Sequence, residues 1–127
     1  MIVLLDTHVL RWWLDGSDLL SPTAREVILS TANSKVTSSV VPWELAIKTN
    51  LGKFDSQVLL SRWDEILEAQ GFSELPIESA HAIRAGLLPL HHRDPFDRIL
   101  AAQAQVTGWP IISADRVFDY YGVRRIW

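Results

Sequence analysis

Two aspartates stand three residues apart in the segment HHRDPFDRILAAQ, just before an apolar stretch with almost no charge. Asp94 precedes Pro95, a pattern typical of a helix N-cap whose carboxylate accepts a hydrogen bond from a first-turn amide. Asp97 falls at the third helical position and shares a helix face with Leu100 and Ala104. It could be the return half of a capping box, although Glu or Gln is usual there. Because a carboxylate on a buried face is costly unless paired or metal-bound, the pattern favours a chemical role for Asp97.

Two further acids fall where the ends of strands are expected, and a third lies in the helix that follows a strand. Asp6 follows the apolar run IVLL, and Asp115 follows PIISA. Glu44 lies in the expected first turn of the helix after the second strand. In parallel sheets, ligands bind beyond the carboxyl ends of the strands, so these acids are expected to meet Asp97 there.

Each of these acids also has a purely structural interpretation. Asp6 could cap the following helix, and Asp115 could form a turn before the next residue. Glu44 could interact with the helix dipole or pair with Lys48, four residues on.

Carboxylates gathered at one edge repel one another, so a cation is their natural partner. The chain has no cysteine, which excludes a disulfide and a thiolate metal site. Oxygen ligands favour Mg²⁺ or Mn²⁺ over zinc. Such ions polarise a phosphodiester and activate water, so the acids suggest metal-dependent hydrolysis.

The elements that must position these acids alternate between strands and helices. Strands are expected at residues 2–5, 35–41, 74–77, 110–113 and 122–127. Helices are expected at residues 7–14, 22–30, 42–52, 55–70, 78–87 and 94–108. This alternation predicts an α/β fold with a parallel sheet covered on both faces, and leaves the strand order open.

Composition narrows the class of protein. A length of 127 residues, 48% hydrophobic content and 21% charge are typical of one soluble globular domain. The net charge of −3 argues against a broad basic surface on a nucleic-acid duplex. No apolar run approaches a membrane span, and the apolar start MIVLL is too short for a signal peptide. We expect a cytoplasmic protein without a membrane partner.

Four segments together resemble the PIN domain, and most closely the VapC-type ribonuclease toxins of bacterial toxin–antitoxin pairs. They are LLDTHVLRWWL, SSVVPWELAIKTNLGKF, LPLHHRDPFDRILAAQA and IISAD, and in order they cover nearly the whole chain. The resemblance implies a single PIN domain over residues 1–127, built as a three-layer α/β/α sandwich around a small, mainly parallel sheet.

The resemblance also implies a Mg²⁺- or Mn²⁺-dependent endoribonuclease. Its catalytic and metal-binding acids correspond to Asp6, Glu44, Asp97 and Asp115, with Asp115 the most variable in role. Thr7 and Ser113 correspond to supporting polar residues, and Asp94 could reach the metal through water. The implied partners are an RNA substrate, a cognate antitoxin, a second copy in a homodimer, and a toxin–antitoxin hetero-oligomer.

Other residue types have weaker interpretations. His91 and His92 are adjacent and lack zinc-site spacing, so RNA contact or loop packing is favoured over ligation. His8 is expected to be a packed helix histidine, and the six Trp are expected to be mostly core or interface anchors, with base stacking an alternative. Six arginines could contact phosphate or simply be solvated: Arg11, Arg93, Arg98, Arg116, Arg124 and Arg125. Arg98 in particular aligns with Ala102 and Gln105, a more solvent-like side.

Two alternatives to the nuclease stay open. A phosphatase with Asp6 as nucleophile would want a second acid two residues on, where His8 stands, and a late lysine, which is absent after Lys53. A catalytically inactive PIN-like module that binds RNA or protein would be expected to lose one or more acids, yet all four are present. Nucleotide-binding glycine motifs are absent.

Overall fold

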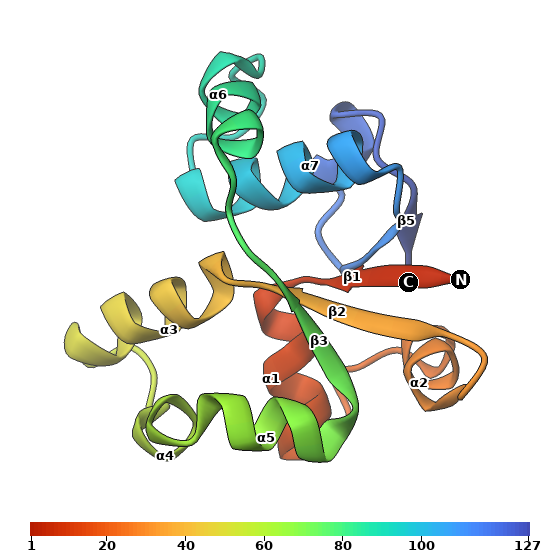
Figure 1. Ribbon diagram of the computed structural model, residues 1–127, viewed down its shortest axis with the longest axis vertical. Coiled ribbons are helices and arrows are strands. Elements are labelled where there is room, and N and C mark those ends of the chain that lie inside the picture. The colour runs from red at the N-terminus through yellow and green to blue at the C-terminus, as the bar shows by residue number, and fades with distance from the viewer.

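In the computed structural model, which describes residues 1–127, a five-stranded parallel sheet lies between helices (Figure 1). The strands are β1 (Ile2–Leu5), β2 (Ser34–Ser38), β3 (Phe72–Leu75), β4 (Ile111–Ile112) and β5 (Arg125–Ile126). Their order across the sheet is β3-β2-β1-β4-β5, and every neighbouring pair is parallel. The predicted α/β sandwich with a small parallel sheet is confirmed.

Eight helices connect and cover the strands. They are α1 (Thr7–Asp15), α2 (Pro22–Leu29), α3 (Val40–Asn50), α4 (Gln57–Ser61), α5 (Trp63–Gln70), α6 (Ser79–Leu87), α7 (Pro95–Thr107) and α8 (Val117–Tyr120). Figure 1 shows α6 and α7 above the sheet and α1, α4 and α5 below it. No helix is both long enough and apolar enough to span a membrane.

The central strand β1 determines where Asp6 leaves the sheet. Val3, Leu4 and Leu5 are completely buried, as expected for a continuous apolar run covered on both faces. In the register of the sheet, Leu5 pairs with Thr37 of β2 and with Ile112 of β4. The residues that follow these three strands therefore leave the sheet at one edge, and Asp6 is among them.

The boundary between β2 and α3 differs from the prediction. Strand β2 ends at Ser38, and α3 begins at Val40 rather than at Pro42. The hydroxyl of Ser38 accepts a hydrogen bond of 3.0 Å from the Val40 amide, so the chain turns into the helix there. Pro42 is tolerated inside the first turn because amides there have no helical partner. Glu44 consequently lies in the second turn of α3, not the first.

Three other differences are local. The single helix expected over residues 55–70 is broken at Arg62, where φ is −125° and ψ is 30°. Strand β3 begins earlier than predicted and ends before Pro76, which has no amide to donate. The short helix α8 was not predicted, because four residues are too few to show a helical period.

Helix α7 is buried on more than one face, which makes the expectation for Arg98 wrong. Ala102 and Gln103 are fully buried along with Leu100, because α6 covers the side of α7 that is turned away from the sheet. Arg98 is only 9% exposed, and its guanidinium donates to backbone carbonyls at the end of α6 and in the loop beyond it. It is therefore not a surface group that could contact phosphate.

Candidate active site

Asp6 links the end of β1 to the start of α1. It is the N-cap of α1, and its Oδ1 accepts a hydrogen bond of 3.0 Å from the His8 amide. Its Oδ2 accepts a 2.5 Å hydrogen bond from the hydroxyl of Ser113, the residue that follows β4. Burial raises the pKa of Asp6, and the Ser113 hydrogen bond acts in the opposite direction. Asp6 therefore caps a helix and also holds a buried carboxylate at the sheet edge.

Asp97 lies in the first turn of α7, where Asp94 and Pro95 start the helix as predicted. Asp94 is the N-cap, with its Oδ1 accepting a 2.9 Å hydrogen bond from the Phe96 amide. The Asp97 carboxylate makes no capping box; its Oδ2 lies 2.8 Å from His92 Nε2. Burial, and then the charges of nearby acids, raise the pKa of Asp97 to about 7. Those acids are Asp6, Asp94 and Glu44.

One cavity of about 190 Å³ brings three of the predicted acids together. Its lining consists of Asp6, His8, Trp12, Asp97, Ala114 and Asp115. Asp115 is exposed, and its Oδ1 accepts a 2.9 Å hydrogen bond from the Val117 amide at the start of α8. The turn-forming interpretation of Asp115 thus holds, and the residue also faces the cavity.

Glu44 is almost completely buried and is not among the residues that line this cavity. Its Oε1 accepts a 2.7 Å hydrogen bond from the Thr7 hydroxyl, and its Oε2 forms an ion pair with Lys48. The alternative of an ion pair with Lys48 is therefore what the structure contains. Glu44 is nonetheless close enough for its charge to raise the pKa of both Asp6 and Asp97.

The polar residues expected to support the acids have definite partners. Thr7 holds Glu44, and Ser113 holds Asp6. The Ser113 hydroxyl also accepts a 3.0 Å hydrogen bond from the Asp115 amide, so a single side chain links two of the predicted acids. Both supporting residues are buried.

His92 and His8 differ from their expected roles, whereas His91 packs against neighbouring side chains as one expectation had it. His92 contacts Asp97 directly, and ligand atoms of His92, Asp94 and Asp97 lie within 4.8 Å of one another, a group that could hold a metal ion. His91 instead stacks on Tyr120, with ring centroids 5.6 Å apart. His8 is not a packed histidine, because half of its side chain is exposed and it lines the cavity. Contacts across loops such as these leave no periodic signal in a sequence.

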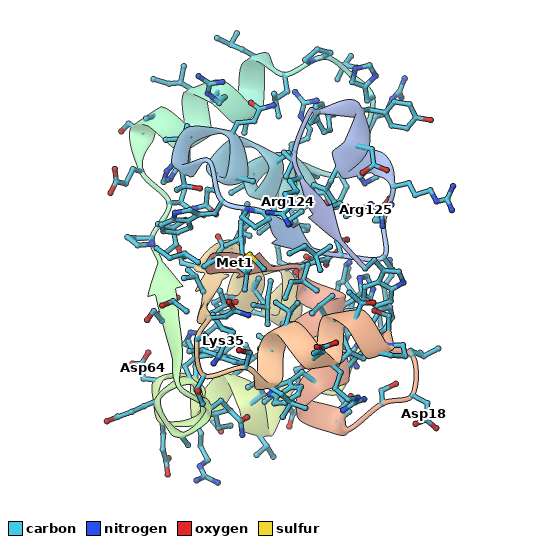
Figure 2. The ribbon with its side chains drawn as sticks, turned by 90° about the vertical axis from the view of Figure 1, so that its right-hand side faces the viewer. Met1, Asp18, Lys35, Asp64, Arg124 and Arg125 are labelled. Carbon is cyan, nitrogen blue, oxygen red and sulfur yellow. The ribbon has the colours of Figure 1, made fainter.

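The tryptophans and the remaining arginines complete the surroundings. Five Trp pack against the core, while Trp43 is 52% exposed and meets the Phe96 ring edge-on at 5.0 Å. Arg93 and Arg116 are exposed. Figure 2 views the end of the molecule where the chain begins, and labels Arg124 and Arg125 beside Met1. Because the acids lie at the other end of β1, Arg124 is far from the cavity.

The residues around the cavity fit a divalent cation. Asp6 is buried and Asp97 is half-buried, and like charge helps to raise the pKa of Asp97, so the two carboxylates have too little positive charge around them to neutralise both. The available donors are carboxylate oxygens with one imidazole, a set that hard cations accept. A larger apolar groove of about 620 Å³ lies over α6 and α7, but none of the predicted acids lines it.

Comparison with known proteins agrees with this arrangement. The family model for the PIN domain matches residues 3–123. The chain belongs to the PIN domain family. Ribonuclease VapC22 of Mycobacterium tuberculosis (strain ATCC 25618 / H37Rv) is 30% identical over 115 residues, which is 90% of this chain and 87% of the relative. This PIN domain is therefore of the VapC type, and the resemblance found in the sequence is confirmed.

Solved structures of VapBC toxin–antitoxin proteins share the fold of this PIN domain. VapBC2 of Rickettsia felis, bound to a DNA fragment from its promoter, gives a TM-score of 0.70 at 15% identity, with full coverage of both chains. VapBC-5 of Mycobacterium tuberculosis gives a TM-score of 0.60 at 18% identity, covering 98% of this chain and 97% of that one. At these identities, the likeness concerns the fold alone.

Proposed function

We propose that the protein is a metal-dependent endoribonuclease and the toxin of a type II toxin–antitoxin pair. The observation that carries the proposal is the position of Asp6 and Asp97 on one cavity, with the pKa of Asp97 raised to about 7. Perturbed carboxylates in a small cavity are typical of catalytic sites. Membership of the VapC-type PIN family, with its relative Ribonuclease VapC22, supports the reaction class.

The cofactor in this proposal is Mg²⁺ or Mn²⁺. Asp6 and Asp97 would hold it, with Asp115 and Asp94 close enough to contribute directly or through water. When bound, such an ion polarises a phosphodiester and lowers the pKa of water. Asp97 releases its proton when the cation supplies the positive charge that the site otherwise lacks.

The other predicted residues act on these acids. Ser113 donates to Asp6 and so favours its charged form while fixing its orientation. Glu44 adds negative charge near Asp97, and Lys48 offsets part of that charge. In this proposal Glu44 is a catalytic-site acid whose Oε2 also forms an ion pair with Lys48. Thr7 fixes the first oxygen.

The proposal extends to the molecular setting. The substrate is RNA, and a cognate antitoxin blocks the site. VapBC-5 of Mycobacterium tuberculosis, which shares the fold, is a member of the VapBC family of toxin–antitoxin systems, which supports an antitoxin partner. We propose a homodimer that assembles with the antitoxin into a hetero-oligomer in the cytoplasm, with residues 1–127 forming a single PIN domain.

The test is RNA cleavage with and without Mg²⁺ or Mn²⁺ by the wild type, Asp6→Asn and Asp97→Asn. Each substitution is expected to reduce cleavage by at least 100-fold, and EDTA is expected to abolish it. Asp18→Asn, which changes an exposed acid that does not line the cavity, is the matched control and should cleave normally. Unaltered metal-dependent cleavage by both active-site variants would rule out the proposed site.

Two other outcomes are diagnostic. RNA binding without cleavage by the wild type would favour a catalytically inactive binding module. Turnover of small phosphate esters that depends on Asp6, with RNA left intact, would favour a phosphatase. The side chain two residues after Asp6 is His8 rather than an acid, which disfavours the phosphatase.

A further inference from the structure

The loop between α6 and α7, residues 88–94, is held by hydrogen bonds from two side chains outside it. The buried Arg98 guanidinium donates to backbone carbonyls over 2.8–3.4 Å. The five acceptors belong to Ala85, Gly86, Leu88, Pro89 and His92. Such charge-assisted hydrogen bonds, made in a buried setting, fix the loop against α7.

Tyr121 supplies the second set of contacts. Its hydroxyl donates a 3.0 Å hydrogen bond to the Pro89 carbonyl and accepts one of 3.1 Å from the His92 amide. The backbone of His92 is therefore held at both of its polar groups, the amide by Tyr121 and the carbonyl by Arg98. The backbone of the loop is therefore anchored by groups other than the His92 imidazole.

The imidazole meets Asp97 instead. His92 Nε2 lies 2.8 Å from Asp97 Oδ2, with 32% of the His92 side chain and 16% of the Asp97 side chain exposed. An imidazole N–H that donates to a carboxylate oxygen fixes both the rotation of the carboxylate and which oxygen stays available. Asp97 Oδ1 is then the oxygen left for another partner.

We propose that His92 is a positioning residue for Asp97: it engages Oδ2 and so leaves Oδ1 to serve the metal site. This inference rests on the proposed function, because it assumes that Asp97 is a metal ligand. Hydrogen-bond partners of ligating carboxylates orient them, and their loss typically costs about 10–100-fold in metal affinity or activity.

The neighbouring histidine offers a matched control. His91 has the same side chain one residue earlier in the same loop, but its ring stacks on Tyr120 and meets Tyr121 at 5.3 Å. It makes no hydrogen bond to an acid of the site. Replacing His91 therefore tests loss of a loop histidine, whereas replacing His92 tests loss of the contact with Asp97.

The experiment is calorimetric titration of Mn²⁺, and separately of Mg²⁺, into the wild type and four variants of the full chain. His92→Ala is expected to weaken binding of both ions about tenfold or more, in line with the loss of an orienting partner. His92→Gln is expected to recover part of the affinity, because its amide can donate to Asp97. His91→Ala should bind like the wild type, and Asp97→Asn should bind neither ion. Thermal unfolding in EDTA should give a single cooperative transition for His92→Ala as for wild type, so that weaker ion binding is not due to loss of the fold.

The outcomes separate this inference from the proposed function. If the wild type binds Mn²⁺ and Asp97→Asn does not, but His92→Ala binds like the wild type, the positioning role is overturned and the metal site stands. If His92→Ala loses Mn²⁺ binding far more than Mg²⁺ binding and His92→Gln recovers nothing, His92 is itself a ligand, and the positioning role is again overturned. If the wild type binds neither ion, both proposals fail.

Discussion

The Ser113 hydroxyl donates a 2.5 Å hydrogen bond to Asp6 Oδ2, and so connects the carboxyl ends of β4 and β1. The two residues are 107 positions apart in sequence, and both are buried. Parallel pairing of β1 with β4 brings them together, so the contact depends on the sheet and not on any local motif. It favours the charged form of a carboxylate that burial otherwise disfavours.

Replacing Ser113 should weaken the protein in a pH-dependent way. In Ser113→Ala, Asp6 loses one of its two donors, and a hydrogen bond to a charged group contributes about 1.5–3 kcal/mol. A neutral carboxyl group loses only about 1 kcal/mol with the same bond. We therefore expect the loss in the free energy of unfolding to be larger above the raised pKa of Asp6 than at pH 4, measured by urea denaturation in EDTA over a series of rising pH values. Ser61→Ala, at an exposed serine on α4, is the control. An equal loss across the whole series would contradict the assignment.

Asp97 makes the metal-free protein less stable as the pH rises. Its pKa is about 7 in the folded state against 3.8 for an ordinary Asp, so the folded protein holds a proton that the unfolded chain releases between these values. The stability that this proton provides is fully present below about pH 4 and is lost as the pH rises through 7. Asp97→Asn removes the ionisation, and should raise the free energy of unfolding at pH 8 by on the order of 2–3 kcal/mol relative to wild type.

The same variant should differ little from wild type near pH 4, where Asp97 is protonated in the folded state. Urea denaturation at pH 4 and pH 8, both in EDTA, measures the difference. Asp18→Asn, at an exposed acid, should change stability by less than about 0.5 kcal/mol at either pH. A destabilised Asp97→Asn at pH 8 would show that the carboxylate is not under repulsion.

Adding a divalent cation should offset the loss of stability that ionised Asp97 causes at pH 8, and should do so in the wild type only. A cation that binds the folded state stabilises it by mass action, by about 2.7 kcal/mol at a concentration 100 times its Kd. Adding Mg²⁺ or Mn²⁺ at pH 8 is therefore expected to raise the melting temperature of the wild type and not that of Asp97→Asn. Ca²⁺ at the same ionic strength separates ion-specific binding from screening. An equal rise in both proteins would point to a general salt effect.

The positions of Asp6 and Asp97 could be predicted from the sequence because each follows from a local pattern. Asp6 follows a run that is buried on both faces, and the carboxyl ends of parallel strands share an edge. Asp97 lies on the face of α7 that carries Leu100 and Ala104, which are buried as expected. Both predictions use local patterns, and the fold around the parallel sheet then brings the two acids to one cavity.

The contacts around those acids could not be predicted in the same way. The helical pattern of α7 suggested one exposed side, but α6 covers that side, so Arg98 is buried and binds the loop backbone. His92 reaches Asp97 only because Arg98 and Tyr121 hold that loop. The start of α3 also shifted, since valines after β2 suit a strand as well as a buried helix turn. Each of these outcomes depends on neighbours that are distant in sequence.

The ion pair between Glu44 and Lys48 allows a test of how much Lys48 stabilises a buried carboxylate of the site. Glu44 is only 2% exposed, and Lys48 is its one basic partner, with Thr7 donating to the other oxygen. Lys48→Met keeps the length of the side chain and removes the charge, which leaves a buried carboxylate unpaired beside Asp97. Breaking a buried ion pair in this way costs about 3–5 kcal/mol. We expect a loss of that order in the free energy of unfolding at pH 8 in EDTA.

The double variant Glu44→Gln/Lys48→Met should recover most of that stability, because no buried charge is then left unpaired. Comparing the stabilities of Glu44→Gln, Lys48→Met and the double variant in urea isolates the coupling energy between the two side chains. Mn²⁺ should rescue Lys48→Met more than the wild type, since a cation near Asp97 also offsets the charge of Glu44. If Lys48→Met were as stable as the wild type in EDTA, the ion pair between Glu44 and Lys48 would contribute nothing to stability, and this prediction would be wrong.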